Sequence, residues 1–352
     1  MLTTDFDYNL PTGLIANSPA FPRDHSRLMV IDRKNGEIFH HRFYEIEKYL
    51  GSNDVLVLNK TKVFPARIYA NKVTGGKVEI LFLEEVKPKI WKTLTHPGLK
   101  INTNISLSKN LFNVIGHEDQ TVLIDTHLTK DKLMELLKLH GHTPIPPYIK
   151  SDRSEDNLRK VYQTVYANSV GSVAAPTAGF HFTQKLLNKL RAKGVQIEYV
   201  TLHVGLGTFA PVKSKNIEDH AIHYEYFEID KNTVHKLNEA KKSGKKIIAV
   251  GTTTTRVLET VANENHKLIV GDSNFTNLFI YPPYKFKFVD SLITNFHLPK
   301  STLLALVASF VSFPNTAKKF KNFRSSLIGK AYQEAIKEKY GFYSFGDGSF
   351  II

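Results

Sequence analysis

The segment KIIAVGTTTTRV, residues 246–257, joins a short apolar run to a glycine, four threonines and an arginine. The apolar run predicts a buried strand, and the residues after the glycine predict a helix that carries Val257, Leu258 and Val261. A strand that passes directly into a helix is the repeating unit of layered α/β domains. This segment therefore favours an α/β fold.

The same alternation continues on both sides of this segment. Thr183 and Asp230 are suited to cap helices, and Ser301 or Thr302 can cap another one further along the chain. Further strands are expected over residues 27–31, 55–58, 195–204 and 286–296. The pattern predicts a single α/β sheet that includes strands from the N-terminal part of the chain.

A different pattern occupies residues 63–125. Short strands separated by turn residues recur about every ten residues, which is typical of a small antiparallel barrel. They are expected over residues 77–83, 90–94, 104–107, 111–115 and 121–124. A helix over 131–140 and the linker PIPP at 144–147 follow. We therefore predict a layered α/β domain of residues 1–60 and 150–352, with an inserted small antiparallel β-barrel domain of residues 61–149.

Length, charge and hydrophobicity limit the class of protein. The chain has 352 residues, enough for two domains, and 42% are hydrophobic, which excludes wholesale disorder. The formal net charge of +14 indicates an anionic partner, although an ordinary enzyme can also be basic. The longest apolar-rich run, 303–313, is much shorter than the roughly 20 residues that cross a bilayer. We therefore expect no membrane partner and favour nucleic acid.

The chain contains no cysteine. Disulfides, cysteine-ligated zinc, iron–sulfur clusters and a cysteine nucleophile are therefore excluded. The first seven residues carry acidic groups where a signal peptide needs basic ones. Both observations fit the reducing cytoplasm, which is the localisation that we expect.

The segment HVGLGTFAP, residues 203–211, has the dinucleotide-binding spacing G-x-G-x-x-A and follows an expected strand. That fingerprint needs a helix to begin within it, whereas Pro211 continues the chain as extended structure. We therefore reject a nicotinamide cofactor. Gly205 and Gly207 could still let the backbone approach a ligand closely, or they form an ordinary glycine turn.

The junction at residues 251–256 places backbone N–H groups and threonine hydroxyls at the start of a helix. Such an arrangement suits a carboxylate or a phosphate. Arg256, one turn into the helix, could add a bidentate contact to that anion. The alternative is ordinary threonine capping without a ligand.

Three histidines lie at loops that could meet in space. His203 and His297 follow expected strands, as Gly251 does, and α/β sheets bind ligands at the carboxyl ends of their strands. His181 stands in the small-residue loop AAPTAGFHFT at 174–183, just before a helix cap. A single histidine is more often structural, but three in such positions favour a functional site.

Other patterns indicate no metal or phosphate-loop chemistry. His220 and His223 have a spacing that metal ligands use, but their surroundings are extended and no carboxylate arrangement accompanies them. We therefore expect no metal site. The sequence has neither a Gly-Lys-Ser/Thr phosphate loop nor a G-x-S-x-G nucleophile elbow.

Nine motifs in register carry a resemblance to a known family. They are DFDYNLP at 5–11, RDHSRL at 23–28, LNKTKVFPAR at 58–67, TGGKVE at 74–79, YQTVYA at 162–167, SVAAPTAGFH at 172–181, TLHVGLGTF at 201–209, GTTTTR at 251–256 and TNFHLPKST at 294–302. In this order they resemble the S-adenosylmethionine:tRNA ribosyltransferase-isomerase family of queuosine biosynthesis, the QueA family. The resemblance extends from Asp5 to Asp347, and each motif alone is weak.

The resemblance implies a particular reaction. The family transfers the ribosyl group of S-adenosylmethionine onto 7-aminomethyl-7-deazaguanine at the wobble position of a tRNA anticodon, and adenine and methionine leave. The ribose is rearranged to an epoxycyclopentanediol, which gives epoxyqueuosine in tRNA. The resemblance also implies an α/β domain with an inserted barrel, S-adenosylmethionine as cosubstrate, and no metal or redox cofactor. We expect a monomer that binds the tRNA anticodon arm.

This chemistry sets requirements for the site. A general base must act on the ribose carbon that the sulfonium makes acidic, and a general acid must protonate the departing adenine. The acid and base candidates are His181, His203 and His297, with Asp290 as their orienting partner. The candidate cosubstrate contacts are Thr177, Gly205, Gly207, Thr252 and Arg256. The candidate RNA contacts are Arg67, Lys72 and Lys77.

Two other functions compete with this interpretation. An S-adenosylmethionine-dependent RNA methyltransferase would share the cosubstrate and the basic charge, but it should show a glycine loop that opens a helix, which Pro211 opposes. A non-catalytic RNA-binding scaffold would explain the charge but not the polar loops at strand ends. The chain departs from the family pattern where Val161 replaces an arginine, Pro283 a glycine and Phe345 a tyrosine.

Overall fold

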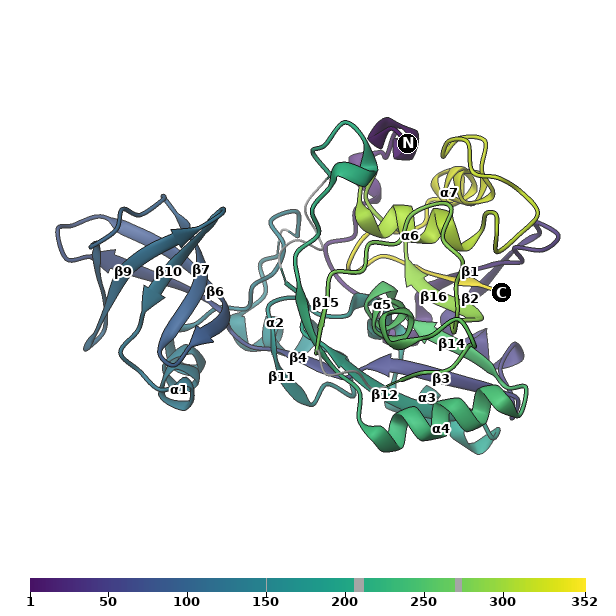
Figure 1. Ribbon diagram of the computed structural model, residues 1–352, viewed down its shortest axis with the longest axis horizontal. Coiled ribbons are helices and arrows are strands. Elements are labelled where there is room, and N and C mark those ends of the chain that lie inside the picture. Colours follow the sequence, from purple (N-terminus) through teal and green to yellow (C-terminus); the bar gives the residue numbers. More distant parts are fainter. Residues whose placement is uncertain (150, 206–211, 270–273) are drawn as a thin grey trace.

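The computed structural model describes residues 1–352 except 150, 206–211 and 270–273. A β-barrel lies at one end of the long axis, and a larger sheet with helices on both faces forms the other part (Figure 1). The chain enters the barrel after the first strands of the sheet and returns to the sheet afterwards. The predicted class, an α/β layer with a separate antiparallel barrel, is confirmed.

The main sheet is mixed, with the order β15-β13-β12-β3-β14-β16-β17-β1-β2 within the described residues. Four neighbouring middle strands run parallel: β12 (Gln196–Leu202), β3 (Asp54–Asn59), β14 (Lys246–Val250) and β16 (Ser291–Asn295). The outer strands are β15 (Phe275–Thr276), β13 (Glu225–Glu228), β17 (Gly348–Ile351), β1 (Arg27–Ile31) and β2 (Ile38–Arg42). Because the middle strands are parallel, their carboxyl ends meet at one edge of the sheet.

Helices cover both faces of this sheet. On one face, Val55 and Ile247 pack in a core with residues of α4 (Lys231–Lys242), α5 (Thr252–Val261), α6 (Thr302–Phe310) and α7 (Leu327–Lys337). On the other face, Leu56 and Ile248 pack with α3 (Gln184–Ala192) and the 3-10 helix η4 (Phe43–Lys48). Burial on both faces explains why these strands are continuous apolar runs. Among the described helices, none has both the length and the apolar character that a bilayer crossing requires.

The barrel closes in the order β10-β7-β6-β5-β8-β9. Its strands are β5 (Arg67–Lys72), β6 (Lys77–Lys87), β7 (Ile90–His96), β8 (Asn104–Leu107), β9 (Asn110–Glu118) and β10 (Thr121–Asp125). Phe82, Trp91 and Phe112 fill its core, and Leu133 and Leu137 of α1 (Lys130–His140) join the same core. Five strands were predicted, and β5 was missed.

Short elements connect the two parts. The strand β4 (Thr61–Val63) pairs in parallel with β11 (Ser169–Ser172) in a separate two-stranded sheet. The return from the barrel passes through α2 (Glu155–Val161) and leads to the 3-10 helix η5 (Thr177–His181). Within the described residues, the other short helices with 3-10 geometry are η1 (Thr3–Phe6), η2 (Thr12–Leu14), η3 (Arg23–His25) and η7 (Ile217–Asp219).

Local signals account for most element boundaries. The side chains of Thr183, Asp230 and Ser301 each accept a backbone N–H at the start of α3, α4 and α6, as predicted. The strand expected over residues 286–296 begins only at Ser291. The reason is that the Glu259 carboxylate accepts the backbone N–H groups of residues 287–289, so these groups cannot join a strand ladder.

Candidate active site

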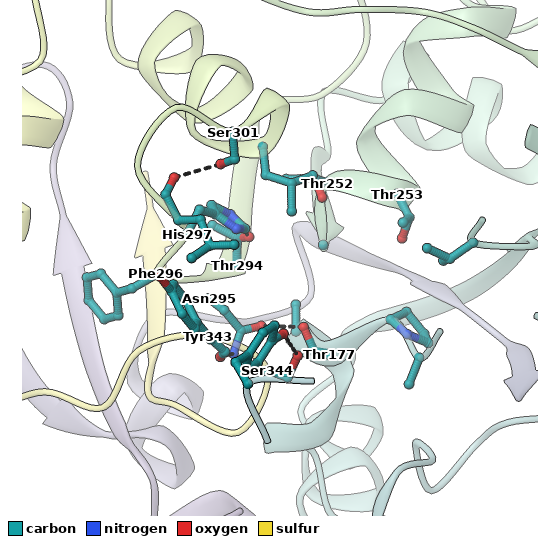
Figure 2. A pocket seen from close by; sticks show the side chains of 18 residues that line it. Thr177, Thr252, Thr253, Thr294, Asn295, Phe296, His297, Ser301, Tyr343 and Ser344 are labelled. Atoms are coloured by element: carbon teal, nitrogen blue, oxygen red, sulfur yellow. Dashed lines mark hydrogen bonds between the residues drawn. The ribbon is translucent and has the colours of Figure 1, made fainter. Parts of the chain in front are cut away.

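A pocket opens at the carboxyl ends of β14 and β16 (Figure 2). About 620 Å³ of space, open solvent included, lies between its wall residues. Its wall comes from η5, the first turn of α5, the loop after β16, the linker that returns from the barrel and the segment before β17. Segments from across the sequence therefore meet at the edge where the sequence predicted a site.

Gly251 forms the turn between β14 and α5. Its φ of 90° lies in a region that favours glycine. Gly251, Thr252 and Thr253 line the pocket, so the first turn of α5 faces it (Figure 2). The hydroxyls of Thr254 and Thr255 instead donate to backbone carbonyls one turn back, at 2.8 and 3.1 Å. Of the four threonines, the first two are therefore placed to meet a ligand.

His297 is the one predicted histidine that lines the pocket (Figure 2). Its Nε2 lies 2.9 Å from Thr294 Oγ1, and its backbone N–H donates to the Tyr332 hydroxyl at 2.9 Å. Burial lowers the pKa of His297 to about 3, so the imidazole is neutral at pH 7. A neutral imidazole has one ring nitrogen that can accept a proton.

His181 lies behind the pocket wall. Its Nδ1 is 2.8 Å from Ser26 Oγ, and its Nε2 is 3.2 Å from the amide nitrogen of Asn295, which does line the pocket. The ring stacks on Phe43 with the centroids 4.8 Å apart. Burial, with a smaller effect from the Arg23 charge, lowers the pKa of His181 to about 3. His181 thus reaches the pocket through Asn295 rather than directly.

His203 follows β12 but points away from the pocket. Val204 lines the pocket, and consecutive residues of an extended chain face opposite sides. His203 Nδ1 lies 2.8 Å from Thr61 Oγ1, and the ring stacks on Tyr226. Burial lowers its pKa as well. The ring packs on Gly171, where an added Cβ would lie 2.5 Å from Nε2.

Arg256 lies outside the pocket, in a buried ion pair. Its guanidinium contacts the Glu225 carboxylate, and its Nε donates to the Leu278 carbonyl at 2.9 Å. The other oxygen of Glu225 accepts the backbone N–H of Gly205 at 2.9 Å. Arg256 therefore holds Glu225 and, through it, the start of the glycine segment. Gly207 lies outside the described residues.

Asp290 does not accompany the histidines. It directly precedes β16, whereas His297 follows that strand, so the two residues lie toward opposite ends of β16. Its carboxylate pairs with Lys241 Nζ at 2.6 Å and accepts the Ile247 backbone N–H at 2.8 Å. Asp290 thus lies at the amino end of β16, whereas the pocket lies at the carboxyl end of that strand. This placement does not fit the expected role of Asp290 in orienting a histidine of the site.

The three candidate RNA contacts lie on the barrel. Lys72 ends β5 and Lys77 begins β6, so they flank one hairpin turn, and Lys77 is exposed. Arg67 begins β5, where its Nε lies 3.1 Å from Glu79 Oε1 and another of its nitrogens donates to the Ile145 carbonyl. The two lysines are therefore more available to a phosphate than the arginine.

The wall residues that were not predicted from the sequence include Tyr148, Asn295, Tyr343 and Ser344. Asn295 stands two positions before His297 in the motif TNFHLPKST at 294–302, so its polar side chain at the end of a strand could have indicated a site residue. Tyr148 directly follows the PIPP linker, and no local pattern shows that this linker turns into the pocket. Its hydroxyl lies 2.7 Å from Ser344 Oγ.

Potential metal ligands do not gather in the part of the chain that the structure describes. No group of three or more His, Asp or Glu residues there is placed to hold an ion. His220 instead packs edge-on against Phe279, with the ring centroids 5.8 Å apart. Within the described residues, His220 and His223 therefore do not belong to a group of three or more possible metal ligands.

Comparison with known proteins gives the class of this fold and site. Residues 3–351 match the family described as Queuosine biosynthesis protein. Proteins named S-adenosylmethionine:tRNA ribosyltransferase-isomerase from Thermotoga petrophila and Thermotoga maritima are 48% identical to this chain, and one from Thermosipho melanesiensis is 46% identical. Each comparison covers 100% of both chains. The chain belongs to the S-adenosylmethionine:tRNA ribosyltransferase-isomerase family of queuosine biosynthesis.

A solved structure shares the fold. It is the crystal structure of S-adenosylmethionine tRNA ribosyltransferase from Thermotoga maritima, with a TM-score of 0.54 and 37% identity in the superposition. The superposition covers 99% of this chain and 100% of the other. The resemblance in sequence motifs thus extends to the architecture as a whole.

Proposed function

We propose that the protein transfers and isomerises the ribosyl group of S-adenosylmethionine onto 7-aminomethyl-7-deazaguanine at the wobble position of tRNA. Adenine and methionine are released, and epoxyqueuosine is formed in the tRNA. The observation that carries this proposal is the full-length identity of 48% to relatives that bear the enzyme's name. The pocket at the strand ends supports it, because its wall joins polar groups to aromatic ones.

The cosubstrate occupies this pocket in our proposal. Its carboxylate meets the backbone N–H groups and the Thr252 hydroxyl at the first turn of α5, where the helix dipole favours negative charge. Its adenine lies against the aromatic rings of Tyr148 and Tyr343, which pack edge-on with centroids 5.0 Å apart. Thr177 adds a polar group from η5.

His297 is the general base in this proposal. The sulfonium makes the adjacent ribose carbon acidic, and a neutral imidazole in the pocket wall can accept that proton. His181 and His203 do not line the pocket, so they act through other residues or serve the fold. The proposed contacts of Arg256 and Gly205 are indirect, because Glu225 binds both.

The tRNA is bound across the barrel domain, residues 61–149, and the pocket edge. A net charge of +14 supports a polyanionic partner, and Lys72 and Lys77 offer cations at one barrel hairpin. The linker that carries Tyr148 joins this barrel to the pocket wall. An anticodon arm that contacts the barrel could therefore bring its wobble base to the pocket. We propose that a single chain is sufficient for this.

The reaction products test the proposal against its two rivals. Protein is incubated with S-adenosylmethionine and tRNA that carries 7-aminomethyl-7-deazaguanine, and the products are identified by mass spectrometry. The proposal expects adenine, methionine and a tRNA base enlarged by the rearranged ribosyl group. S-adenosylhomocysteine would instead establish a methyltransferase, and tRNA binding without consumption of S-adenosylmethionine would establish a scaffold.

A further inference from the structure

A chain of hydrogen bonds runs from the interior to the pocket wall. Ser26 Oγ lies 2.8 Å from His181 Nδ1, and His181 Nε2 lies 3.2 Å from Asn295 Nδ2. Asn295 Oδ1 accepts the Thr177 hydroxyl at 3.2 Å (Figure 2). Ser26, His181 and Asn295 are 5%, 3% and 2% exposed, whereas Thr177 is partly exposed and lines the pocket. Water therefore has little access to the first three groups.

A backbone carbonyl fixes the direction of this chain. Asn295 Nδ2 also donates to the Tyr343 carbonyl at 3.2 Å, and a carbonyl can only accept. The amide nitrogen must therefore be the atom that faces both Tyr343 and His181. His181 Nε2 then has to accept, so its proton is on Nδ1 and is donated to Ser26 Oγ. In the imidazolium form, an Nε2–H would point at the amide N–H of Asn295, so two donors would face each other. The low pKa of His181 agrees with this arrangement, because it keeps the ring neutral.

The same direction determines what Thr177 presents to a ligand. Because Asn295 Oδ1 can only accept, the single hydroxyl proton of Thr177 is used toward Asn295. The lone pairs of Thr177 Oγ1 are then left for the pocket. We infer that His181 is a positioning residue, which holds Asn295 so that Thr177 accepts a hydrogen bond from an N–H or O–H group of the cosubstrate.

This inference rests on the proposed function for the identity of the ligand. The Nδ1–H tautomer of His181 does not depend on that function, because it follows from the hydrogen bonds alone. S-adenosylmethionine offers three kinds of donor: the adenine amino group, the ribose hydroxyls and the methionine ammonium. All three would suit an acceptor in the wall. The inference also removes His181 from the candidates for proton transfer, since both of its nitrogens are engaged in a fixed direction.

The first test measures the tautomer of His181 directly. ¹⁵N chemical shifts of the histidine ring in the native protein, with His181→Gln as the assignment control, distinguish the Nδ1–H form, the Nε2–H form and the imidazolium. We expect the Nδ1–H form, unchanged from pH 8 to pH 5. An Nε2–H form, or an imidazolium at pH 6, would overturn the inference. This readout needs neither ligand nor activity.

The second test measures binding of S-adenosylmethionine by calorimetry without tRNA. Thr177→Val, which keeps the shape but loses the hydroxyl, should bind roughly five- to tenfold more weakly, and Thr177→Ser should bind nearly as the native protein does. Equal affinity of Thr177→Val and the native protein would contradict the role of Thr177. If the native protein binds no S-adenosylmethionine, the proposed function fails while the tautomer result still stands.

Analogues identify which donor Thr177 meets. Three are used, each lacking one kind of donor: an analogue with hydrogen in place of the adenine amino group, a 2′,3′-dideoxy analogue and an analogue without the α-amino group. The analogue that lacks the relevant donor should bind the native protein and Thr177→Val with equal affinity. The other two analogues should retain the difference between the two proteins. A difference that persists with all three analogues would show that Thr177 accepts from none of these groups.

Discussion

The hydroxyls of Tyr148 and Ser344 lie 2.7 Å apart in the pocket wall. Tyr148 belongs to the linker that returns from the barrel, and Ser344 to the segment that leads into β17. Burial raises the pKa of Tyr148 to about 12, so its hydroxyl keeps its proton at neutral pH. This hydrogen bond therefore ties the barrel connection to the pocket.

We expect the Tyr148–Ser344 bond to support turnover on tRNA. Tyr148→Phe and Ser344→Ala should each lower kcat/KM for tRNA about three- to tenfold, because each removes the same partly buried hydrogen bond. The double variant should be no worse than either single one, since both remove the same interaction. Steady-state kinetics measure the effect, with Tyr44→Phe at an exposed tyrosine of η4 as the control. Fully additive losses would show that the two hydroxyls act separately.

Acid should destabilise the protein through its buried histidines. The pKa values of His181 and His297 fall to about 3 in the folded state, whereas an unfolded histidine titrates near 6.5. Their stabilising contribution is complete above pH 6.5 and is lost as the pH falls from 6.5 toward 3, because the unfolded chain binds the protons. The loss is roughly 1.4 kcal/mol per pH unit for each group. Urea unfolding at pH 7.5 and 5.0 should show a smaller acid loss in His181→Gln and in His297→Gln than in the native protein. Identical acid losses would contradict these pKa shifts.

The buried ion pair of Arg256 should matter for stability more than for the cosubstrate. Arg256→Ala removes the guanidinium from a buried ion pair, which typically costs about 3–5 kcal/mol. Denaturant unfolding measures this loss, and Lys48→Ala at the exposed pair with Glu45 is the control that should show little effect. A stable Arg256→Ala variant with a large specific loss of S-adenosylmethionine affinity would instead place Arg256 at the ligand.

Binding of tRNA should weaken steeply with salt. Each phosphate that a lysine or arginine neutralises releases counterions, so log Kd should rise linearly with log salt. The Lys72→Ala and Lys77→Ala double variant should reduce that slope by about 2, because two phosphate contacts are lost. Titrations of labelled tRNA between low and moderate salt measure the slope. A flat dependence would remove the electrostatic part of the proposal.

The fold was largely predictable because its signals are local. Strand burial appears as apolar runs such as residues 246–250, and helix starts appear as caps such as Thr183 and Asp230. The C-terminal strand β17 was missed, since GSFI is too short for a pattern and pairs with two strands far away in sequence. Long-range pairing of this kind leaves no local trace.

The position of the site was predictable from the sequence, but most of the residues that line the pocket were not. Strand ends placed His297 and Gly251 at one edge, and the structure brings both to the pocket. Val204 faces the pocket, so the neighbouring His203 side chain faces the other side of the extended chain. The role of Arg256 depends on its ion pair with Glu225, which is 31 positions away in the sequence. Phe345, where the family pattern has a tyrosine, stacks on Phe180 in an apolar cluster rather than in the pocket. These relations are tertiary, so single motifs could not show them.

Release of adenine tests the central claim most directly. Native protein and His297→Gln are each mixed with S-adenosylmethionine and the precursor tRNA, and free adenine is followed over time by mass spectrometry. We expect one adenine per modified tRNA from the native protein. In His297→Gln the rate should fall by about 10²–10⁴, the usual contribution of a general base, while tRNA binding stays unchanged. No adenine from the native protein, or full release by the variant, would contradict the account.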